Sequence, residues 1–423
     1  MLRNCFFVAI AAVAAACGQP AIDAELVIEN VTIIPGDGGP AYLGDVAIAD
    51  GAFAAVGEFE AGAIGQTING EGLYLAPGLW DMHIHLASDR NEGLDPEALI
   101  RHGVTSVLDL GGHEERIAYL RDEIAAGRLA GPTIYAAGPT LNGESFGDFQ
   151  DVVTTAEAAR TKVRALEAWG ADIVKIHRAF PVELMPELIR EATSRELKVT
   201  GHIPLGMHPQ AACEAGMAGV QHLGSILEAY VSVAPAEGAN IGDAIAYMES
   251  DAAKPLINCL VERKVAVTPT LVIYPAIARS RTPEGYEIPA ALQAHLDAIN
   301  RIAGRLSDSG VAMLVGTDTA YPALINLEPG AAYHDELAIL QAAGLEPSLL
   351  IRMATSSAAE HLGVDGETGS IAVGKAADFL LLKEDPLADI RNLRSIEAVY
   401  RKGLRVAGAL TPSPQDGAPP PEE

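Results

Sequence analysis

Two histidines one residue apart, His83 and His85, lie in the apolar, β-prone stretch of residues 75–86. Side chains two apart in a strand point to the same face. The pair could therefore converge on one metal ion, while Met82 and Ile84 would face the opposite layer. A His-x-His pair is a weak signal by itself, because paired histidines also occur on surfaces and in hydrogen-bonded cores. A metal site requires further ligands from elsewhere in the chain.

Four more side chains with ligand or acid–base chemistry follow short apolar runs: Lys175, His202, His222 and Asp318. Lys175 stands between valine and isoleucine, and a lysine in an apolar interior is costly to bury in its charged form. Carboxylation by carbon dioxide would turn its amine into a carbamate, an anionic oxygen ligand that can bridge two cations. The ordinary alternatives are hydrogen-bonded core histidines and an Asp318 that caps the next helix.

The elements that would position these side chains alternate between strand and helix. Apolar runs are followed by Ala/Leu/Glu-rich stretches of helical period, such as residues 155–169. Counting from the His-x-His run gives eight strands, the number that closes a (β/α)8 TIM barrel, an α/β fold with catalytic groups at the carboxyl ends of its strands. An open doubly wound sheet is the alternative, disfavoured because no Gly-x-Gly-x-x-Gly follows an early strand. The later strands are residues 104–110, 133–137, 172–177, 198–203, 219–223, 264–271 and 311–318.

Both ends of the chain have the composition of short strands and turns. We predict a small β-sandwich built from residues 25–74 and 365–410, with the barrel of residues 75–364 inserted between them. The Pro-rich residues 411–423 are predicted to be a disordered tail. The strand-like runs are residues 25–34, 44–56, 369–382 and 396–406.

The composition fits a globular enzyme with one large domain and a smaller one. The 423 residues include 29 basic and 56 acidic side chains, a formal net charge of −27. This excess of negative charge argues against a nucleic-acid partner and against a basic membrane-binding patch. The expected partner is a small-molecule or short-peptide substrate, and a homo-oligomer stays open.

The first residues have the pattern of an export signal. Arg3 precedes an apolar run too short to span a bilayer, so residues 1–16 are predicted to be a signal peptide. The following Val-Ala-Ala-Ala-Cys resembles a bacterial lipobox, which implies a periplasmic or envelope protein anchored by lipid on Cys17. Ala14 stands where leucine is commoner, so cleavage and release stay open. We expect Cys213 and Cys259 to be buried small apolar residues, with a disulfide as the alternative.

The ordered set of motifs resembles the amidohydrolase superfamily, and it is far more specific than any one motif. The most similar branch comprises imidazolonepropionase-like and prolidase-like (Xaa-Pro dipeptidase-like) members with a carboxylated lysine, and the resemblance covers roughly residues 25–410. The motifs are Pro-Gly-Leu-Trp-Asp-Met-His-Ile-His ending at His85, Val-Lys-Ile at Lys175, Gly-His-Ile-Pro at His202, Gln-His-Leu at His222 and Gly-Thr-Asp-Thr at Asp318.

The resemblance implies a metal centre with two divalent ions, for which zinc suits the imidazole and carboxylate ligands. His83, His85 and Asp318 would hold the more buried ion. His202 and His222 would hold the other, and carboxylated Lys175 would bridge both together with a hydroxide. Two such cations lower the pKa of a bridging water toward neutrality. Asp318 would be the catalytic residue, taking the proton of the hydroxide and passing it to the leaving amine.

Other polar residues near the strand ends are candidates for substrate binding. His177 and Arg178 follow Lys175 and could bind a substrate carboxylate, or could belong to a solvated loop. The resemblance implies a histidine before a helix at His334, which would lie beside the site or face the substrate. Tyr230 could help to polarise the carbonyl, although a packing role is the simpler interpretation.

Two departures from prolidase-like sequences leave dipeptide specificity open. Residues 138–142 lack a Gly-Gly-His that many members carry, and residues 223–226 lack a tyrosine. The first functional interpretation is hydrolysis of an amide in a dipeptide or an N-acyl amino acid. The alternatives are a mononuclear deaminase or cyclic imide or lactone hydrolase of the same fold, and a non-catalytic envelope lipoprotein that uses the barrel for binding.

Overall fold

The computed structural model describes residues 21–87, 95–145, 147, 149–235, 237–282, 287–319 and 327–408. The predicted signal peptide, Cys17 and the predicted tail of residues 411–423 lie outside the described residues. No helix in the described part of the chain is both long enough and apolar enough to cross a bilayer.

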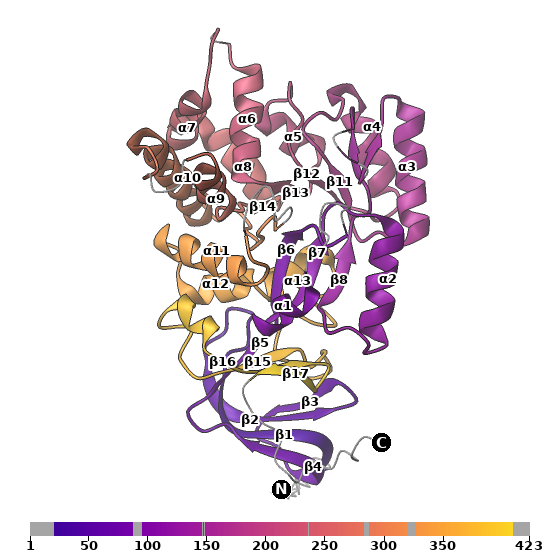
Figure 1. Cartoon of the computed structure of the whole chain (residues 1–423), viewed down its shortest axis with the longest axis vertical. Helices are drawn as coiled ribbons and strands as arrows, with labels where there is room; N and C mark the ends of the chain where they lie inside the picture. The colour runs from indigo at the N-terminus through magenta and orange to yellow at the C-terminus, as the bar shows by residue number, and fades with distance from the viewer. Residues whose placement is uncertain are drawn as a thin grey trace, which may run out of the picture.

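Strands from both ends of the chain form one mixed eight-stranded sheet, at the bottom of Figure 1. Its order is β17-β16-β15-β5-β1-β2-β3, with β4 parallel to β1. Phe53 lies 5.9 Å from Phe379 between ring centroids, so the sheet curls and encloses an apolar core of its own. The strands are β1 (Ile22–Ile33), β2 (Tyr42–Ala49), β3 (Ala52–Gly57), β4 (Ala61–Asn69), β5 (Tyr74–Pro77), β15 (Phe379–Leu382), β16 (Ile396–Arg401) and β17 (Leu404–Gly408).

The middle of the chain contributes two parallel sheets, of six and three strands. The segment 312–319 lies between them, since Met313 bridges to Val267 and Thr319 bridges to Ile84. The strand predicted over residues 311–318 is therefore present only as isolated bridges, and Asp318 has a φ of 53° that an extended strand does not allow. The strands are β6 (Leu79–Ile84), β7 (Val104–Asp109), β8 (Thr133–Ala136), β9 (Thr140–Asn142), β10 (Gln150–Val152), β11 (Val174–Ile176), β12 (Val199–Gly201), β13 (Gly219–Gln221) and β14 (Ala266–Thr268).

Helices follow these strands and surround them in Figure 1. The helix predicted from residue 155 is present: the Thr155 side chain accepts a hydrogen bond from Ala158 N, and Gly170 ends the helix in the left-handed region. The α-helices are α1 (Pro96–Arg101), α2 (Glu114–Ala125), α3 (Ala156–Trp169), α4 (Met185–Thr193), α5 (Pro209–Ala215), α6 (Leu223–Val233), α7 (Ile241–Glu249), α8 (Lys254–Glu262), α9 (Ile273–Ser280), α10 (Ala290–Asp308), α11 (Ala331–Ala342), α12 (Pro347–Met353) and α13 (Ser356–Leu362). Short 3-10 helices cover Val182–Leu184, Asp251–Ala253 and Ile390–Arg394.

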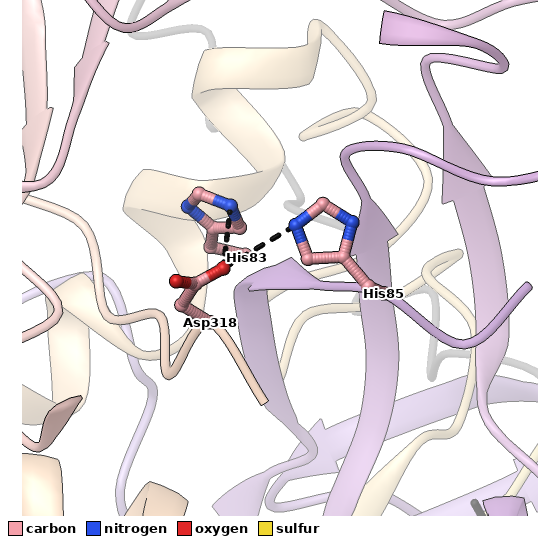
Figure 2. Close-up of side chains that lie close together, drawn as sticks. All are labelled: His83, His85 and Asp318. Atoms are coloured by element: carbon pink, nitrogen blue, oxygen red, sulfur yellow. Dashed lines mark ion pairs between the residues drawn. The ribbon is translucent and has the colours of Figure 1, made fainter. Parts of the chain in front are cut away.

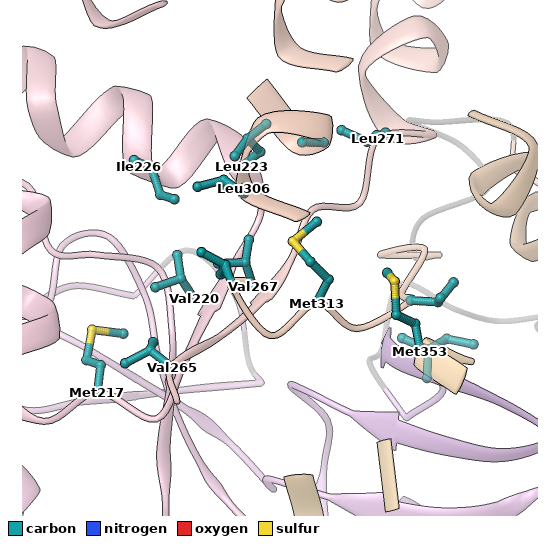
Figure 3. Packing of buried hydrophobic residues seen from close by; sticks show 14 of the residues in the cluster. Met217, Val220, Leu223, Ile226, Val265, Val267, Leu271, Leu306, Met313 and Met353 are labelled. Carbon is teal, nitrogen blue, oxygen red and sulfur yellow. The ribbon is translucent and has the colours of Figure 1, made fainter. Parts of the chain in front are cut away.

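The largest apolar cluster packs the strands against the helices, and Figure 3 shows part of it. Val220 of β13 and Val267 of β14 meet Ile226 of α6, Leu306 of α10 and Met313, and all five are buried. Burial of each aliphatic side chain of this size stabilises the fold by about 1.5–3 kcal/mol. Strand β13, which precedes His222, its neighbour β14 and the segment before Asp318 therefore pack on one shared apolar cluster.

Cys213 of α5 and Cys259 of α8 form a disulfide bond across 46 residues of sequence. The expectation that both are unpaired small apolar residues is wrong, and the alternative is correct. Both cysteines are buried, as expected, but α5 packs directly on α8 and brings the two sulfurs together. Sequence spacing does not reveal this tertiary neighbourhood.

We expect the double substitution Cys213→Ser and Cys259→Ser to lower the free energy of unfolding by about 4 kcal/mol, because a loop of this length is closed in the unfolded chain. Urea denaturation followed by circular dichroism measures the difference. A reductant should destabilise the parent by a similar amount and leave the double variant unchanged. Equal midpoints for the parent and the double variant would contradict the prediction.

Candidate metal centre

Three predicted ligands meet at the carboxyl end of β6, as Figure 2 shows. One carboxylate oxygen of Asp318, Oδ1, lies 3.2 Å from His83 Nε2 and 3.3 Å from His85 Nε2. One ligand atom from each residue lies within 4.8 Å of the others. His83 and His85 come from the end of one strand and Asp318 from the bridging segment 312–319, so the site lies where the two parallel sheets approach each other.

The imidazoles of five histidines continue from this point in a row of ring contacts. His83 contacts His85 and His222, with ring centroids 5.3 Å and 4.6 Å apart. His222 in turn lies 4.6 Å from His202, which lies 4.3 Å from His177. The side chains that follow β6, β11, β12 and β13 thus gather at one end of the parallel strands. This is the placement that the sequence predicts for the ligands.

Hydrogen bonds fix which ring nitrogens are available. His83 Nδ1 is 2.9 Å from the Gln221 side-chain oxygen, and His85 Nδ1 is 3.0 Å from the Gly111 carbonyl oxygen. Both acceptors require an N–H at Nδ1, which leaves each Nε2 with a lone pair directed at Asp318 Oδ1. His202 differs, since its Nδ1 is buried and has no hydrogen-bond partner among the described residues. His202 therefore has Nδ1 available as a ligand atom, whereas His83 and His85 have Nε2 available.

Lys175 lies inside this cluster at the centre of β11. It is 2% exposed, and its Nζ is 3.4 Å from His83 Nε2. Burial lowers the pKa of Lys175 to about 7, partly offset by attraction to the charge of Asp318. No carboxylate hydrogen-bonds to this amine in the described part of the chain. Burial of an amine beside imidazoles costs free energy of folding, and groups with such strongly shifted pKa values cluster at functional sites.

The electrostatics favour neutral imidazoles at His83, His202 and His222 and an ionised carboxylate. At His85 burial opposes protonation, but the hydrogen bond and the charge of Asp318 outweigh it and raise the pKa above its usual value. Burial lowers the pKa of His83 and His202 well below the usual value, and lowers that of His222 to about 4. Burial opposes ionisation of Asp318, but attraction to His222 and His85 outweighs it, so the pKa of Asp318 lies below its usual value. Neutral imidazole and charged carboxylate are the protonation states that bind a divalent cation.

Several supporting residues were missed by the sequence analysis. Asp81 accepts hydrogen bonds from His83 N and Thr317 N, and so ties β6 to the segment that carries Asp318. Gln221 holds His83 Nδ1 and donates to Thr200, while Thr270 lies 2.8 Å from His222 Nδ1. Asp81 and Gln221 stand in the quoted motifs and could have been suspected from their positions. Thr270 gives no such signal.

The candidate substrate-binding residues fall in two groups. His177 contacts the His202 ring, and the Arg178 side chain is 47% exposed and 4.0 Å from Glu228. Tyr230 instead stacks on Tyr247 at 4.2 Å. His334 Nε2 donates to the carbonyl oxygen of His102, and its ring contacts are with His102 and Tyr333. His177 therefore lies beside the cluster and the half-exposed Arg178 follows it, whereas Tyr230 and His334 lie in packing positions.

The donor set fits divalent metal ions. Lone pairs at Nε2 of His83 and His85 and an ionised Asp318 carboxylate supply one complete three-ligand group. The partnerless Nδ1 of His202 and the neighbouring His222 supply further nitrogen donors. Without a cation, the buried His202 nitrogen would carry an uncompensated desolvation cost.

Comparison with known proteins shows the family of the chain. The amidohydrolase family model matches residues 74–406. Ochratoxinase of Aspergillus niger is 25% identical over 87% of this chain and 83% of its own, and adenine deaminase 1 of Jannaschia sp. is 27% identical over 95% of this chain and 60% of its own. The crystal structure of a Xaa-Pro dipeptidase with bound methionine is 20% identical, covers 90% of this chain and 99% of its own, and has a TM-score of 0.69. This likeness shows that the chain has a fold of the TIM-barrel type with mixed α/β content, as predicted. The chain belongs to the amidohydrolase family and is a hydrolase that acts on carbon–nitrogen bonds.

Proposed function

We propose that this amidohydrolase uses two divalent metal ions to hydrolyse an amide bond in a small substrate with a free carboxylate, such as a dipeptide or an N-acyl amino acid. The observation that carries the proposal is the convergence of four imidazoles, one carboxylate and a buried lysine at one end of the parallel strands. Similarity to ochratoxinase and to a Xaa-Pro dipeptidase supports it. We interpret the two parallel sheets and segment 312–319 as one closed (β/α)8 barrel.

Each ligand has an assigned place in this proposal. His83, His85 and Asp318 would hold one ion, His202 and His222 would hold the other, and Lys175, if carboxylated at Nζ, would supply anionic oxygen ligands between them. Zinc is the favoured metal, because it accepts imidazole and carboxylate ligands together. When bound, such a pair of cations supplies an ionised water at neutral pH and polarises the carbonyl group of the substrate.

The protein's own residues orient the reactants and move the proton. Asp318 is held between His83 and His85, and its pKa lies below the usual value, so its carboxylate is ionised and has oxygen lone pairs that can accept a proton. It takes the proton of the attacking water and delivers it to the nitrogen of the leaving amine. His177 and Arg178, beside His202, would receive the carboxylate of the substrate.

Arg178→Gln should raise KM about tenfold for substrates with a free carboxylate, because it removes a charge-assisted hydrogen bond while leaving the reacting groups in place. Steady-state kinetics with a substrate and its uncharged carboxamide analogue measures the effect. The analogue should show no change in KM between the parent and the variant. A similar rise in KM for both compounds would contradict the assignment of Arg178 to the carboxylate.

A substrate screen tests the function directly. The zinc-loaded protein is assayed against dipeptides, N-acyl amino acids, lactones, cyclic imides and adenine, and its metal content is measured. Release of amines from the first two classes with two ions per chain is the expected result. One ion per chain with activity on adenine or a cyclic imide would favour a mononuclear deaminase, which similarity to adenine deaminase 1 makes the second candidate. A protein with two metals and no hydrolysis in any class would favour a binding lipoprotein.

We also propose that the chain is exported and anchored in the cell envelope through Cys17. The Cys213–Cys259 disulfide supports export, since such bonds persist in oxidising compartments. Fractionation and mass spectrometry of the N-terminus test this. A cytoplasmic chain that retains residues 1–16 would contradict the proposal.

A further inference from the structure

A loop of residues 268–274, called the cradle loop below, wraps the segment that carries His222. It receives hydrogen bonds from three successive backbone N–H groups at the start of α6 and one from the imidazole of His222. The segment therefore cannot shift unless the cradle loop shifts with it. The four contacts are His222 N to Thr268 O at 2.9 Å, Leu223 N to Pro269 O at 3.1 Å, Gly224 N to Tyr274 Oη at 2.6 Å, and His222 Nδ1 to Thr270 Oγ1 at 2.8 Å.

The backbone is strained on both sides of this contact. His222 has a φ of 66° and Thr270 a φ of 49°, in the left-handed region that favours glycine. For a β-branched threonine this conformation is a clear outlier, and it persists only where surrounding contacts enforce it. The hydroxyl group of Thr270 also donates its proton to the Pro269 carbonyl oxygen. Its oxygen is therefore the acceptor for the N–H at His222 Nδ1. Contacts from outside the cradle loop are therefore needed to hold it in this conformation.

Glu336 of α11 provides that anchor. Its side chain is fully buried, and Oε2 accepts a hydrogen bond of 2.6 Å from the N–H of Val272 in the cradle loop. Its Oε1 is also buried and has no hydrogen-bond partner among the described residues. Burial raises the pKa of Glu336 to about 8, so the acid is mostly neutral at pH 7. Burial of a carboxyl group costs free energy of folding. The hydrolytic chemistry proposed above assigns no role to Glu336.

We infer that Glu336 is a positioning residue for the metal centre: by holding the Val272 N–H it fixes the cradle loop, so that Thr270, through His222 Nδ1, keeps the imidazole of His222 in its place beside His83 and His202. The inference rests on the proposed function for its metal, but the hydrogen bonds exist in the chain without it. Loss of Glu336 would leave the buried Val272 N–H without a partner. The cradle loop would then relax and release His222.

Substitutions at Glu336, Asp335 and Thr270 test the inference. Glu336→Leu removes the acceptor, whereas Glu336→Gln keeps an acceptor oxygen and resembles the neutral acid. Asp335→Leu is the matched control on the same helix, where an exposed carboxylate pairs with Arg394. Hydrogen–deuterium exchange of the metal-free protein reports on the amides of Leu223 and Gly224. Zinc release to a chelator reports on His222 in the loaded protein.

Glu336→Leu should speed exchange at Leu223 and Gly224 and speed zinc release by about tenfold or more. Glu336→Gln and Asp335→Leu should stay close to the parent in both measurements. Thr270→Val should also speed zinc release, and its combination with Glu336→Leu should add little, because both act through one set of contacts.

Unchanged exchange in Glu336→Leu would overturn the inference. So would a Glu336→Gln variant that releases zinc as fast as the leucine variant, since that result would assign the carboxyl group itself an acid–base role. If Glu336→Leu does not fold, Thr270→Val and Glu336→Gln still decide between these outcomes. A parent that binds no zinc would contradict the proposed function alone, because the exchange measurements need no metal.

Discussion

Replacing Asp318 with asparagine should lower kcat for an amide substrate by about 10³-fold, because the variant cannot accept the proton of the attacking water. Asparagine keeps the shape of the side chain and one oxygen that can act as a ligand. In the parent, Asp318 Oδ1 lies within 3.3 Å of both His83 Nε2 and His85 Nε2, so the proton acceptor and two proposed ligands share one position. Steady-state kinetics and metal analysis on the same preparation measure the effect.

The metal content decides how the Asp318 variant is interpreted. With two ions retained, a loss in kcat and little change in KM assigns the defect to proton transfer. Asp335→Asn serves as a control, since this exposed aspartate pairs with Arg394 at the surface and such pairs contribute little. An Asp318→Asn protein that keeps both ions and full activity would remove the mechanism proposed here.

The positions of the ligand side chains could be predicted from local sequence. His83, Lys175, His202 and His222 lie within or directly after β6, β11, β12 and β13, because strand parity and short apolar runs are local properties. The strand expected before Asp318 is present only as isolated bridges, and the positive φ of Asp318 departs from extended backbone there. The alternation of side chains along a strand predicted that His83 and His85 face the same side. It did not predict the backbone conformation that supports the ligands.

The contacts that hold the ligands could not be predicted, because they join segments far apart in sequence. Thr270 meets His222 across 48 residues, and Glu336 meets Val272 across 64. The Cys213–Cys259 bond has the same origin, since it depends on α5 packing against α8. In each case the residue type allows the contact, but only the assembled helices determine the partner.

Lys175→Ala should lower zinc affinity by about 10²-fold or more and abolish hydrolysis, because it removes the proposed bridging ligand. The parent side chain is 2% exposed and lies 3.4 Å from His83 Nε2, so its loss leaves a buried space beside the other ligands. A carbamate carries the same charge and the same pair of oxygens as a carboxylate. Formate, acetate or propionate should therefore enter that space and restore part of the zinc binding and activity.

The rescue separates carboxylated Lys175 from an ordinary buried lysine. Lys175→Met fills the space with an apolar chain, so carboxylates should not restore its activity, and Lys254→Ala, at an exposed site paired with Asp251, should match the parent throughout. Zinc uptake by the parent should also depend on bicarbonate, which supplies the carbon dioxide that the amine takes up as it loses a proton. Two ions and full activity in carbonate-free buffer would contradict the bridging carbamate. That result would leave Lys175 as an uncharged amine beside His83, with no part in holding the two ions.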